Sequence, residues 1–423
     1  MISPTPQQLA WQDLGVGAFF HVGVNTFHAK EWSDGTLPAA SFDPSELDAA
    51  QWVEVARSAG ARYVVVTAKH HDGFCLWPTR TTDYSVASSP WKDGRGDVVG
   101  ELAQACRDAG LGFGVYLSPW DRHAPEYEDP ATYTKLYAEQ LRELCTWYGP
   151  LVELWFDGAG SEGYSYDWAA IMAVAHEHQP DAMVFNMGDP TIRWVGNEDG
   201  LASDPVEYVV DHTQMSNYTV VTSEFAEALY LPPECDVSIR RGWFWSPDDE
   251  PKSLEHLLAI YYRSVGLGAN LLLNLPPDDR GLIPEADAAR ARELGAEVAR
   301  RFGTPAASAE PSGPAAGGDG PATWTARFDG PVALDHLRLR EDLTHGQRAV
   351  RHTVRAGDRV LASGGTVGAG RIHLVEPVTT RELTVELVGD GARLSSVEAF
   401  ATGVRRLPQV PEGYAAPTDY PDS

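Results

Sequence analysis

The sequence contains few cysteines, and none is spaced to form a metal or redox site. Four occur among 423 residues, at positions 75, 106, 145 and 235, and no two form a CxxC pair. Zinc ribbons and redox dithiols depend on that spacing, so neither is predicted. Cys106 and Cys145 fall within helical patterns and are expected to be small core residues.

Basic residues are also scarce. Lys and Arg number 33 against 60 Asp and Glu, which gives a net charge of −27. Proteins that bind nucleic acid or an anionic membrane carry basic patches, so we expect neither partner. No apolar run approaches the roughly 18 residues that span a membrane. The first six residues have neither a basic start nor an apolar segment, which favours a cytoplasmic protein unless a signal peptide has been removed.

The sequence does contain enough apolar residues for a large core. Hydrophobic residues make up 43% of the chain, and 13 Trp and 16 Tyr are high counts. Aromatic side chains at this density either fill thick core layers or line a cleft that stacks against sugars, and core packing is the commoner use.

Strand-like and helical segments alternate along the first 300 residues. Apolar strands are expected at residues 17–24, 63–67, 112–118, 151–156, 183–187 and 270–275, and helices at 45–60, 97–110, 131–148, 168–178, 254–265 and 286–302. The alternation is interrupted between residues 190 and 250. No GxGxxG follows the first strand, and polar residues follow nearly every strand. We therefore predict an α/β fold, an irregular (β/α)8 TIM-like barrel over residues 1–303, rather than a doubly wound sheet.

The pattern changes after residue 303. Residues 304–321 are rich in Ala, Gly, Pro and Ser and are predicted to be a linker. Residues 322–407 then alternate with a period of two between turn signals, as in an antiparallel β-sandwich. Its strands are expected at residues 323–328, 334–339, 352–356, 359–362, 372–375, 383–387 and 397–400. Residues 408–423 are expected to be an extended tail.

The strand at residues 151–156 stops abruptly at Asp157. The carboxyl ends of barrel strands converge on one face, where such barrels place their chemistry. Other polar and aromatic residues occur at strand ends or just after them, namely His21, Glu31, Trp32, His70, His71 and Tyr116. Asp157 could also simply open a turn, but this convergence favours a site.

His70 and His71 allow three interpretations. Adjacent residues of an extended chain point in opposite directions, so a shared metal ion is disfavoured, and no HExxH motif is present. Buried core histidines are an ordinary alternative. Histidines together with Tyr and Trp also suit a ligand with many hydroxyls and one apolar face, which describes a sugar.

Sugar hydrolysis by most glycosidases requires two carboxyl groups. Asp157 is the best candidate for a nucleophile, and Trp155 points to the same side of the strand. Candidates for the second carboxyl are Glu198, Glu224 and Glu234. Glu198 lies in a loop next to Trp194, where burial could raise its pKa, although an ordinary solvated loop acid has the same local sequence.

Six motifs in one order carry a family resemblance. FFHVGVNTF, EWS, KHHDGFCLWPT, VYLSPWD, ELWFDG and RWVGNE resemble the α-L-fucosidases of glycoside hydrolase family 29 over roughly residues 10–300. LREDLTHGQR and the β-rich end resemble that family's C-terminal sandwich. KHHDGFCLW and RWVGNE are similar to the subgroup that cleaves α-1,3/1,4-linked fucose on branched Lewis-type glycans.

The resemblance implies a retaining mechanism without a metal or other cofactor. Asp157 matches the nucleophile and Glu198 the acid/base, with Glu234 as the alternative. His21, Glu31, Trp32, His70, His71, Tyr116 and Trp155 match positions that hold the fucose. Trp194 lies beside Glu198, and Trp243 could pack on the methyl group of the sugar or simply fill the core.

The expected substrate is therefore a fucosylated oligosaccharide. Broad-specificity fucosidase activity, hydrolysis of another sugar and carbohydrate binding without catalysis remain the alternatives. The sandwich shows no evident aromatic platform, so we expect it to brace the barrel rather than bind sugar. The sequence does not predict the oligomeric state.

Overall fold

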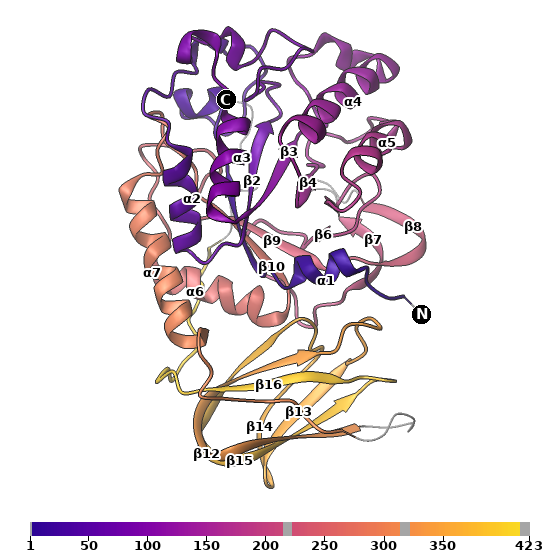
Figure 1. The fold of residues 1–423 in the computed structure, drawn as a ribbon, viewed down its shortest axis with the longest axis vertical. Coiled ribbons are helices and arrows are strands. Elements are labelled where there is room, and N and C mark those ends of the chain that lie inside the picture. The colour runs from indigo at the N-terminus through magenta and orange to yellow at the C-terminus, as the bar shows by residue number, and fades with distance from the viewer. Residues whose placement is uncertain (1, 215–221, 314–321, 415–423) are drawn as a thin grey trace.

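The computed structural model describes residues 2–214, 222–313 and 322–414. They form a barrel of strands and helices, followed by a sheet of antiparallel strands that packs against one end of it (Figure 1).

Eight parallel strands make up the barrel. They are β1 (Val16–Phe20), β2 (Tyr63–Lys69), β3 (Gly112–Leu117), β4 (Glu153–Trp155), β5 (Met183–Phe185), β6 (Arg193–Trp194), β9 (Pro233–Ser238) and β10 (Asn270–Asn274). Their order is β5-β4-β3-β2-β1-β10-β9-β6, and a parallel bridge between Phe185 and Ile192 connects β5 to the residue before β6. The sheet is thus nearly closed, and the predicted (β/α)8-like barrel is confirmed.

α1 (Pro6–Gln12) lies at the end of the barrel where the strands begin, and its Trp11 belongs to the cluster inside the barrel. The helices on the outside of the barrel are α2 (Ala49–Ser58), α3 (Val98–Ala109), α4 (Pro130–Trp147), α5 (Trp168–His178), α6 (Leu254–Arg263) and α7 (Glu285–Phe302). Four of them begin after an aspartate whose carboxylate accepts backbone N–H groups of the first turn, namely Asp48, Asp97, Asp129 and Asp167. These N-caps fix where each connection turns into its helix.

Short 3-10 turns occupy several connections. They are η1 (Val24–His28), η2 (Ala39–Ser41), η3 (Val86–Ser88), η4 (Trp91–Gly94), η5 (Pro125–Glu128) and η6 (Val265–Leu267). η1 occupies the end of the strand predicted at residues 17–24, because β1 already leaves the sheet at Phe20. β4 is likewise shorter than the predicted 151–156, because only Glu153–Trp155 pair with neighbouring strands.

The second half of the barrel is irregular. In the described part of the chain no helix lies between β5 and β6, and an antiparallel hairpin of β7 (Val209–Gln214) and β8 (Thr222–Tyr230) lies between β6 and β9. This departure from the strand–helix repeat explains why the sequence pattern is interrupted between residues 190 and 250.

Six antiparallel strands follow the barrel in the order β11-β16-β12-β15-β13-β14. They are β11 (Ala307–Ala309), β12 (Ala322–Glu341), β13 (Arg351–Ala356), β14 (Arg359–Gly364), β15 (Arg371–Val388) and β16 (Leu394–Phe400). β12 covers two predicted strands, at residues 323–328 and 334–339, and β15 covers two more, at residues 372–375 and 383–387. Bulges interrupt the pairing of β12 with β15, but each chain segment continues as one strand through them. β11 lies inside the predicted linker, of which residues 314–321 fall outside the described part.

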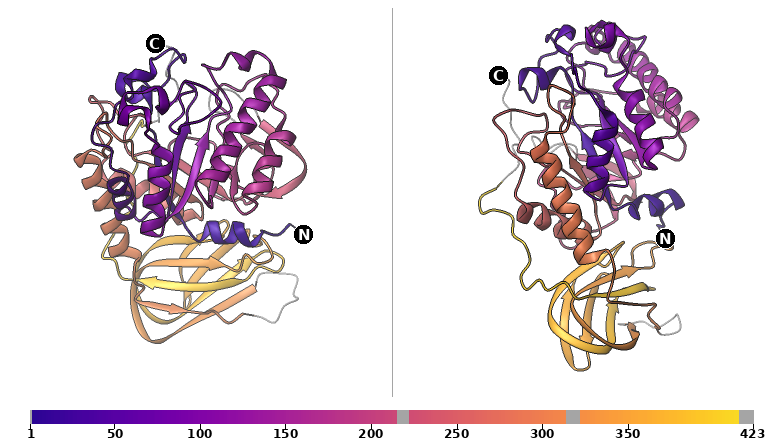
Figure 2. Two further views of the ribbon diagram at one scale, coloured as in Figure 1. Left: turned by 45° about the horizontal axis from the view of Figure 1, so that its top comes forward. Right: turned by 60° about the vertical axis from the view of Figure 1, so that its left-hand side comes forward.

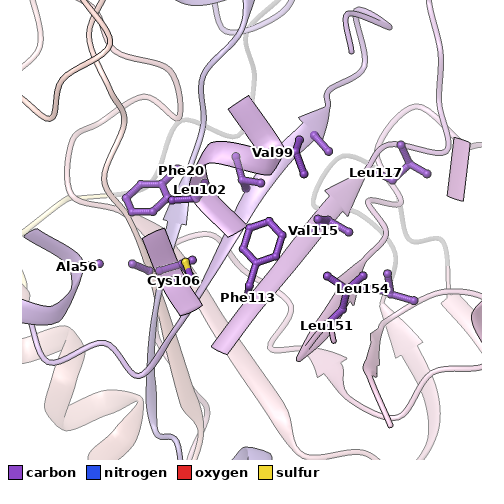
Figure 3. Close-up of a cluster of buried hydrophobic side chains, with 14 of the residues drawn as sticks. Phe20, Ala56, Val99, Leu102, Cys106, Phe113, Val115, Leu117, Leu151 and Leu154 are labelled. Atoms are coloured by element: carbon purple, nitrogen blue, oxygen red, sulfur yellow. The ribbon is translucent and has the colours of Figure 1, made fainter. Parts of the chain in front are cut away.

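Strand β2 shows why a barrel strand is apolar on both faces: each face packs against a core. Val64 and Val66 belong to the core between the strands and the helices, whereas Tyr63 and Val65 point into the barrel. Figure 3 shows part of that outer core, with Phe113 and Val115 of β3 facing Leu102 and Cys106 of α3. The same alternation directs Trp155 inward and Phe156 outward. Asp157 therefore follows in the inward direction, at the point where β4 ends.

The antiparallel sheet contacts the end of the barrel where the strands begin. Ile372 and Phe400 of this sheet form one apolar cluster with Tyr261, Tyr262 and Phe302 of α6 and α7. The arrowheads of β2 and β3, which mark the carboxyl ends of these barrel strands, point away from the antiparallel sheet (Figures 1 and 2). The sheet therefore stands opposite the face on which the strand ends converge.

The chain then returns along the outside of the barrel. Arg406 pairs with Glu255, and the Tyr414 ring packs edge-on against His256 of α6. The remainder of the predicted tail, residues 415–423, lies outside the described residues. None of the described helices combines the length and the apolarity needed to cross a bilayer.

Candidate active site

Asp157 lies at the carboxyl end of β4 with a hydrogen-bond donor facing each of its oxygens. The Tyr116 hydroxyl donates to Oδ2 at 2.9 Å, and the Ala159 backbone N–H donates to Oδ1 at 2.9 Å. Tyr116 is adjacent because it pairs with Trp155 in the register of β3 and β4. The carboxylate remains 24% exposed, so one side of it is open to a ligand.

His71 is fixed in one tautomer by Ser118. The Ser118 hydroxyl donates to the Trp120 carbonyl at 2.6 Å, so its oxygen must accept from His71 Nδ1, which lies 2.7 Å away. Burial lowers the pKa of His71, so the ring is neutral. Its Nε2 therefore carries a lone pair, 3.5 Å from Asp157 Oδ2, and can accept a hydrogen bond from a ligand hydroxyl.

His21 and His70 complete a group of three buried histidines. The His21 ring lies 5.9 Å from that of His70, and the His70 ring stacks parallel to Tyr116 at 5.8 Å. Burial lowers the pKa of His21 to about 3 and that of His70 well below its ordinary value. All three rings are thus neutral hydrogen-bonding groups at working pH.

Glu31 anchors a distant loop to the site. Its Oε2 accepts the Trp243 N–H at 2.8 Å, and its Oε1 accepts the Phe244 N–H at 3.2 Å. Burial raises the pKa of Glu31 to about 7 despite these two donors. The contact brings the loop after β9 beside His21, whose ring lies 4.9 Å from the Trp243 ring.

Glu198 contacts Trp243 at its indole, whereas Glu31 contacts its backbone. The indole N–H of Trp243 donates to Glu198 Oε2 at 3.3 Å. Burial, followed by the Asp157 carboxylate, raises the pKa of Glu198 to about 8, and the indole bond offsets part of that rise. Glu198 is therefore protonated at neutral pH and close enough to Asp157 to sense its charge.

These residues, which we call the cup, bring together two partly exposed carboxyl groups, neutral imidazoles and several aromatic rings. Trp32 packs edge-on against His71 and Trp120, at 5.4 and 5.5 Å. A proton donor beside a carboxylate acceptor can act on a bond that needs both an acid and a nucleophile, as in glycoside hydrolysis.

The comparisons with known proteins agree with this chemistry. The family model described as α-L-fucosidase matches residues 36–300, more than half of the chain. The chain belongs to the α-L-fucosidase family. This confirms the resemblance at the level of the family.

Individual α-L-fucosidases match in sequence and in structure. Alpha-L-fucosidase 1 of Arabidopsis thaliana is 44% identical over 293 residues, which cover 67% of this chain and 58% of the relative. The structure named SpGH29 matches with a TM-score of 0.86 and 34% identity, covering 95% of this chain and 98% of that one. A GH29 fucosidase of Ruminococcus gnavus, solved in complex with fucose, matches with a TM-score of 0.82 and 27% identity, covering 94% and 95%.

Two tryptophans predicted to bind substrate lie in the interior of this fucosidase-family barrel. Both faces of Trp155 are covered, by Phe185 at 3.9 Å and by Tyr116 at 5.3 Å, and its N–H donates to Glu234. The Trp194 N–H donates to Asp236 at 2.6 Å. The Trp155 ring therefore packs against the Tyr116 ring inside the barrel. The indole N–H groups of both tryptophans are already hydrogen-bonded within the protein.

The alternative acids lie away from the cup. Glu234 is fully buried near the start of β9, between Tyr63 and Trp155, and about 13 Å along the strand from Ser238 at its carboxyl end. Glu224 is exposed on β8. Glu198 is thus the one candidate of the three that the fold brings to Asp157.

Two residues of the site, Ser118 and Asn274, were not singled out in the sequence. Ser118 sets the His71 tautomer, and Asn274 at the end of β10 accepts from His21 and donates to the Trp243 carbonyl. A polar residue that ends an apolar barrel strand was the available signal for both. In residues 2–214, 222–313 and 322–414, no three His, Cys, Asp or Glu side chains are grouped so as to hold a metal ion.

Proposed function

We propose that this protein is a retaining exo-α-L-fucosidase that uses Asp157 as nucleophile and Glu198 as acid/base. The observation that carries the proposal is the pairing of a hydrogen-bonded, partly open Asp157 carboxylate with a Glu198 whose pKa is raised to about 8. One group is arranged to attack, and the other holds a proton at neutral pH.

The reaction proceeds in two steps. Asp157 attacks the anomeric carbon of an α-L-fucosyl residue while Glu198 gives its proton to the departing glycosidic oxygen. A covalent fucosyl-enzyme forms, and the leaving sugar departs with its new hydroxyl. Glu198, now ionised, takes a proton from water, whose oxygen displaces Asp157 and restores the α-configuration.

The neutral histidines suit the hydroxyls of fucose. His71 Nε2 is an acceptor on the side of Asp157, and Tyr116 orients the nucleophile itself. The rings of Trp243 and Phe244 lie 4.9 and 5.6 Å from the His21 ring and supply an apolar surface. Fucose carries a methyl group where other hexoses carry a polar hydroxymethyl group, so such a surface favours it.

The function test is a pair of variants. Asp157→Gly should lose nearly all turnover, and added azide should restore part of it by forming a fucosyl azide. Glu198→Ala should lose activity on substrates with poor leaving groups while keeping much of it on activated ones. Wild-type turnover in Asp157→Gly would refute the assignment of the nucleophile.

The linkage preference is proposed from the motifs KHHDGFCLW and RWVGNE. We expect hydrolysis of α-1,3/1,4-linked fucose on branched Lewis-type glycans, and slow hydrolysis of 2'-fucosyllactose and simple aryl fucosides. A side-by-side assay of Lewis a and Lewis x trisaccharides, 2'-fucosyllactose and an aryl fucoside tests this. The anomer released first, followed by NMR, tests retention of configuration.

A further inference from the structure

Asn274 occupies a position from which one side chain reaches two parts of the site. It is the last residue of β10, it is fully buried, and it pairs with Phe19 of β1 and Ser238 of β9. Its Oδ1 accepts the His21 backbone N–H at 3.1 Å and meets His21 Nδ1 at 3.0 Å. Its Nδ2 donates to the Trp243 carbonyl at 2.8 Å and to Ser238 Oγ at 3.0 Å.

The orientation of this amide follows from its partners. A carbonyl oxygen can only accept, so the amide NH2 must face Trp243 and the amide oxygen must face His21. The His21 backbone N–H, which can only donate, requires the same orientation. The proton of the neutral His21 ring therefore sits on Nδ1, and Nε2 is left as an acceptor.

The same amide holds the residue that contacts the acid. The Trp243 backbone is held at its N–H by Glu31 and at its carbonyl by Asn274. With both ends of this residue fixed, the indole packs at a tilt of 35° against the His21 ring and its N–H reaches Glu198. A loss of either backbone bond would free the indole to move away from Glu198.

We propose that Asn274 is a positioning residue that couples sugar binding to acid catalysis, by fixing the His21 tautomer and the Trp243–Glu198 contact with one amide. The inference rests on the proposed role of Glu198. It predicts that a change at Asn274 affects the acid-dependent step more than it affects folding.

The deciding variant is Asn274→Asp, which keeps the shape and the acceptor for His21 but replaces the donor that faces the Trp243 carbonyl. We expect kcat/KM for poor leaving groups to fall about tenfold or more, as partial loss of a general acid does, and to fall much less for activated aryl fucosides. Ser238→Ala is the matched control, because it removes the other acceptor of the same NH2 without touching His21 or Trp243. In the control we expect kcat/KM to change by the same factor for poor and for activated leaving groups.

The outcomes separate this inference from the function on which it rests. If Glu198→Ala loses activity selectively on poor leaving groups but Asn274→Asp does not, the role of Asn274 alone is overturned. If Glu198→Ala shows no such selective loss, the assignment of the acid is overturned. A selective loss of equal size in Ser238→Ala would show a general loosening of the network and would also overturn the inference.

A measurement on the wild-type protein covers the case in which Asn274→Asp fails to fold. The ring 15N shifts of His21, assigned with a His21→Gln variant, distinguish the two neutral tautomers. The proposal requires the proton on Nδ1. A proton on Nε2 would refute it, because Asn274 would then not be the acceptor for the ring.

Discussion

The Trp243 indole should lower the pKa of Glu198, the proposed acid, and removing its N–H should raise that pKa further. The N–H donates to Glu198 Oε2 at 3.3 Å and stabilises the ionised form, against the opposing effects of burial and of Asp157. Trp243→Phe keeps an aromatic ring beside His21 but deletes the donor. The proton on Glu198 should then be held more tightly.

The size of the shift follows from the strength of the bond. A hydrogen bond to a charged group contributes about 1.5–3 kcal/mol, and the 3.3 Å separation places this one at the lower end. At about 1.4 kcal/mol for each pKa unit, the pKa of Glu198 should rise by about one unit from its present value of about 8.

The assay is the pH dependence of kcat/KM on a substrate with a poor leaving group, for which the protonated acid is required. The alkaline limb of the profile should move up by about one unit in Trp243→Phe. Trp245→Phe, two residues further along the same loop, is the control, because it removes an indole N–H but leaves the Trp243–Glu198 bond intact. An unmoved limb, or one displaced to lower pH, would refute the reasoning.

Three further variants test other contacts. Tyr116→Phe removes a donor to Asp157, the proposed nucleophile, and should lower kcat by about 10- to 100-fold with little change in melting temperature, measured by kinetics and calorimetry. Ser118→Ala removes the acceptor for His71 Nδ1–H and should raise KM or the inhibition constant of free fucose more than it lowers kcat. Glu234→Gln should flatten the loss of stability with rising pH. Burial raises the pKa of Glu234 in the folded state, so stability falls as pH rises from about 4.5 through that folded pKa, by about 1.4 kcal/mol for each unit of elevation. An unchanged slope of melting temperature against pH would contradict this last prediction.

The barrel and half of the cup were predictable because they depend on local sequence. Each of the six strands predicted in the barrel is an apolar run, and Asp157 and the His70–His71 pair are polar residues at the ends of such runs. In a parallel barrel the strand ends meet at one face, so placing each residue on a strand was enough to bring them together.

The loop contacts were not predictable in the same way. Glu31 and Trp243 are 212 residues apart in sequence, and they meet only because the barrel closes through β10 and β1. Glu234 was the alternative acid because the sequence placed it, like Glu198, on one of the later loops. The structure makes it the second residue of β9, so it enters the barrel at the end opposite the site.

Depth in the barrel explains why only some of its carboxyl groups can do chemistry. Glu153, Glu234 and Asp236 all point into the closed interior, and burial raises the pKa of each. These acids tend to stay protonated and act as fixed hydrogen-bonding groups below the cup. Asp157 follows the end of β4 and Glu198 follows the end of β6, where the side chains are partly exposed. A carboxyl group at this rim can exchange its proton with a ligand or with water, so the same residue type is structural in the interior and reactive at the strand ends.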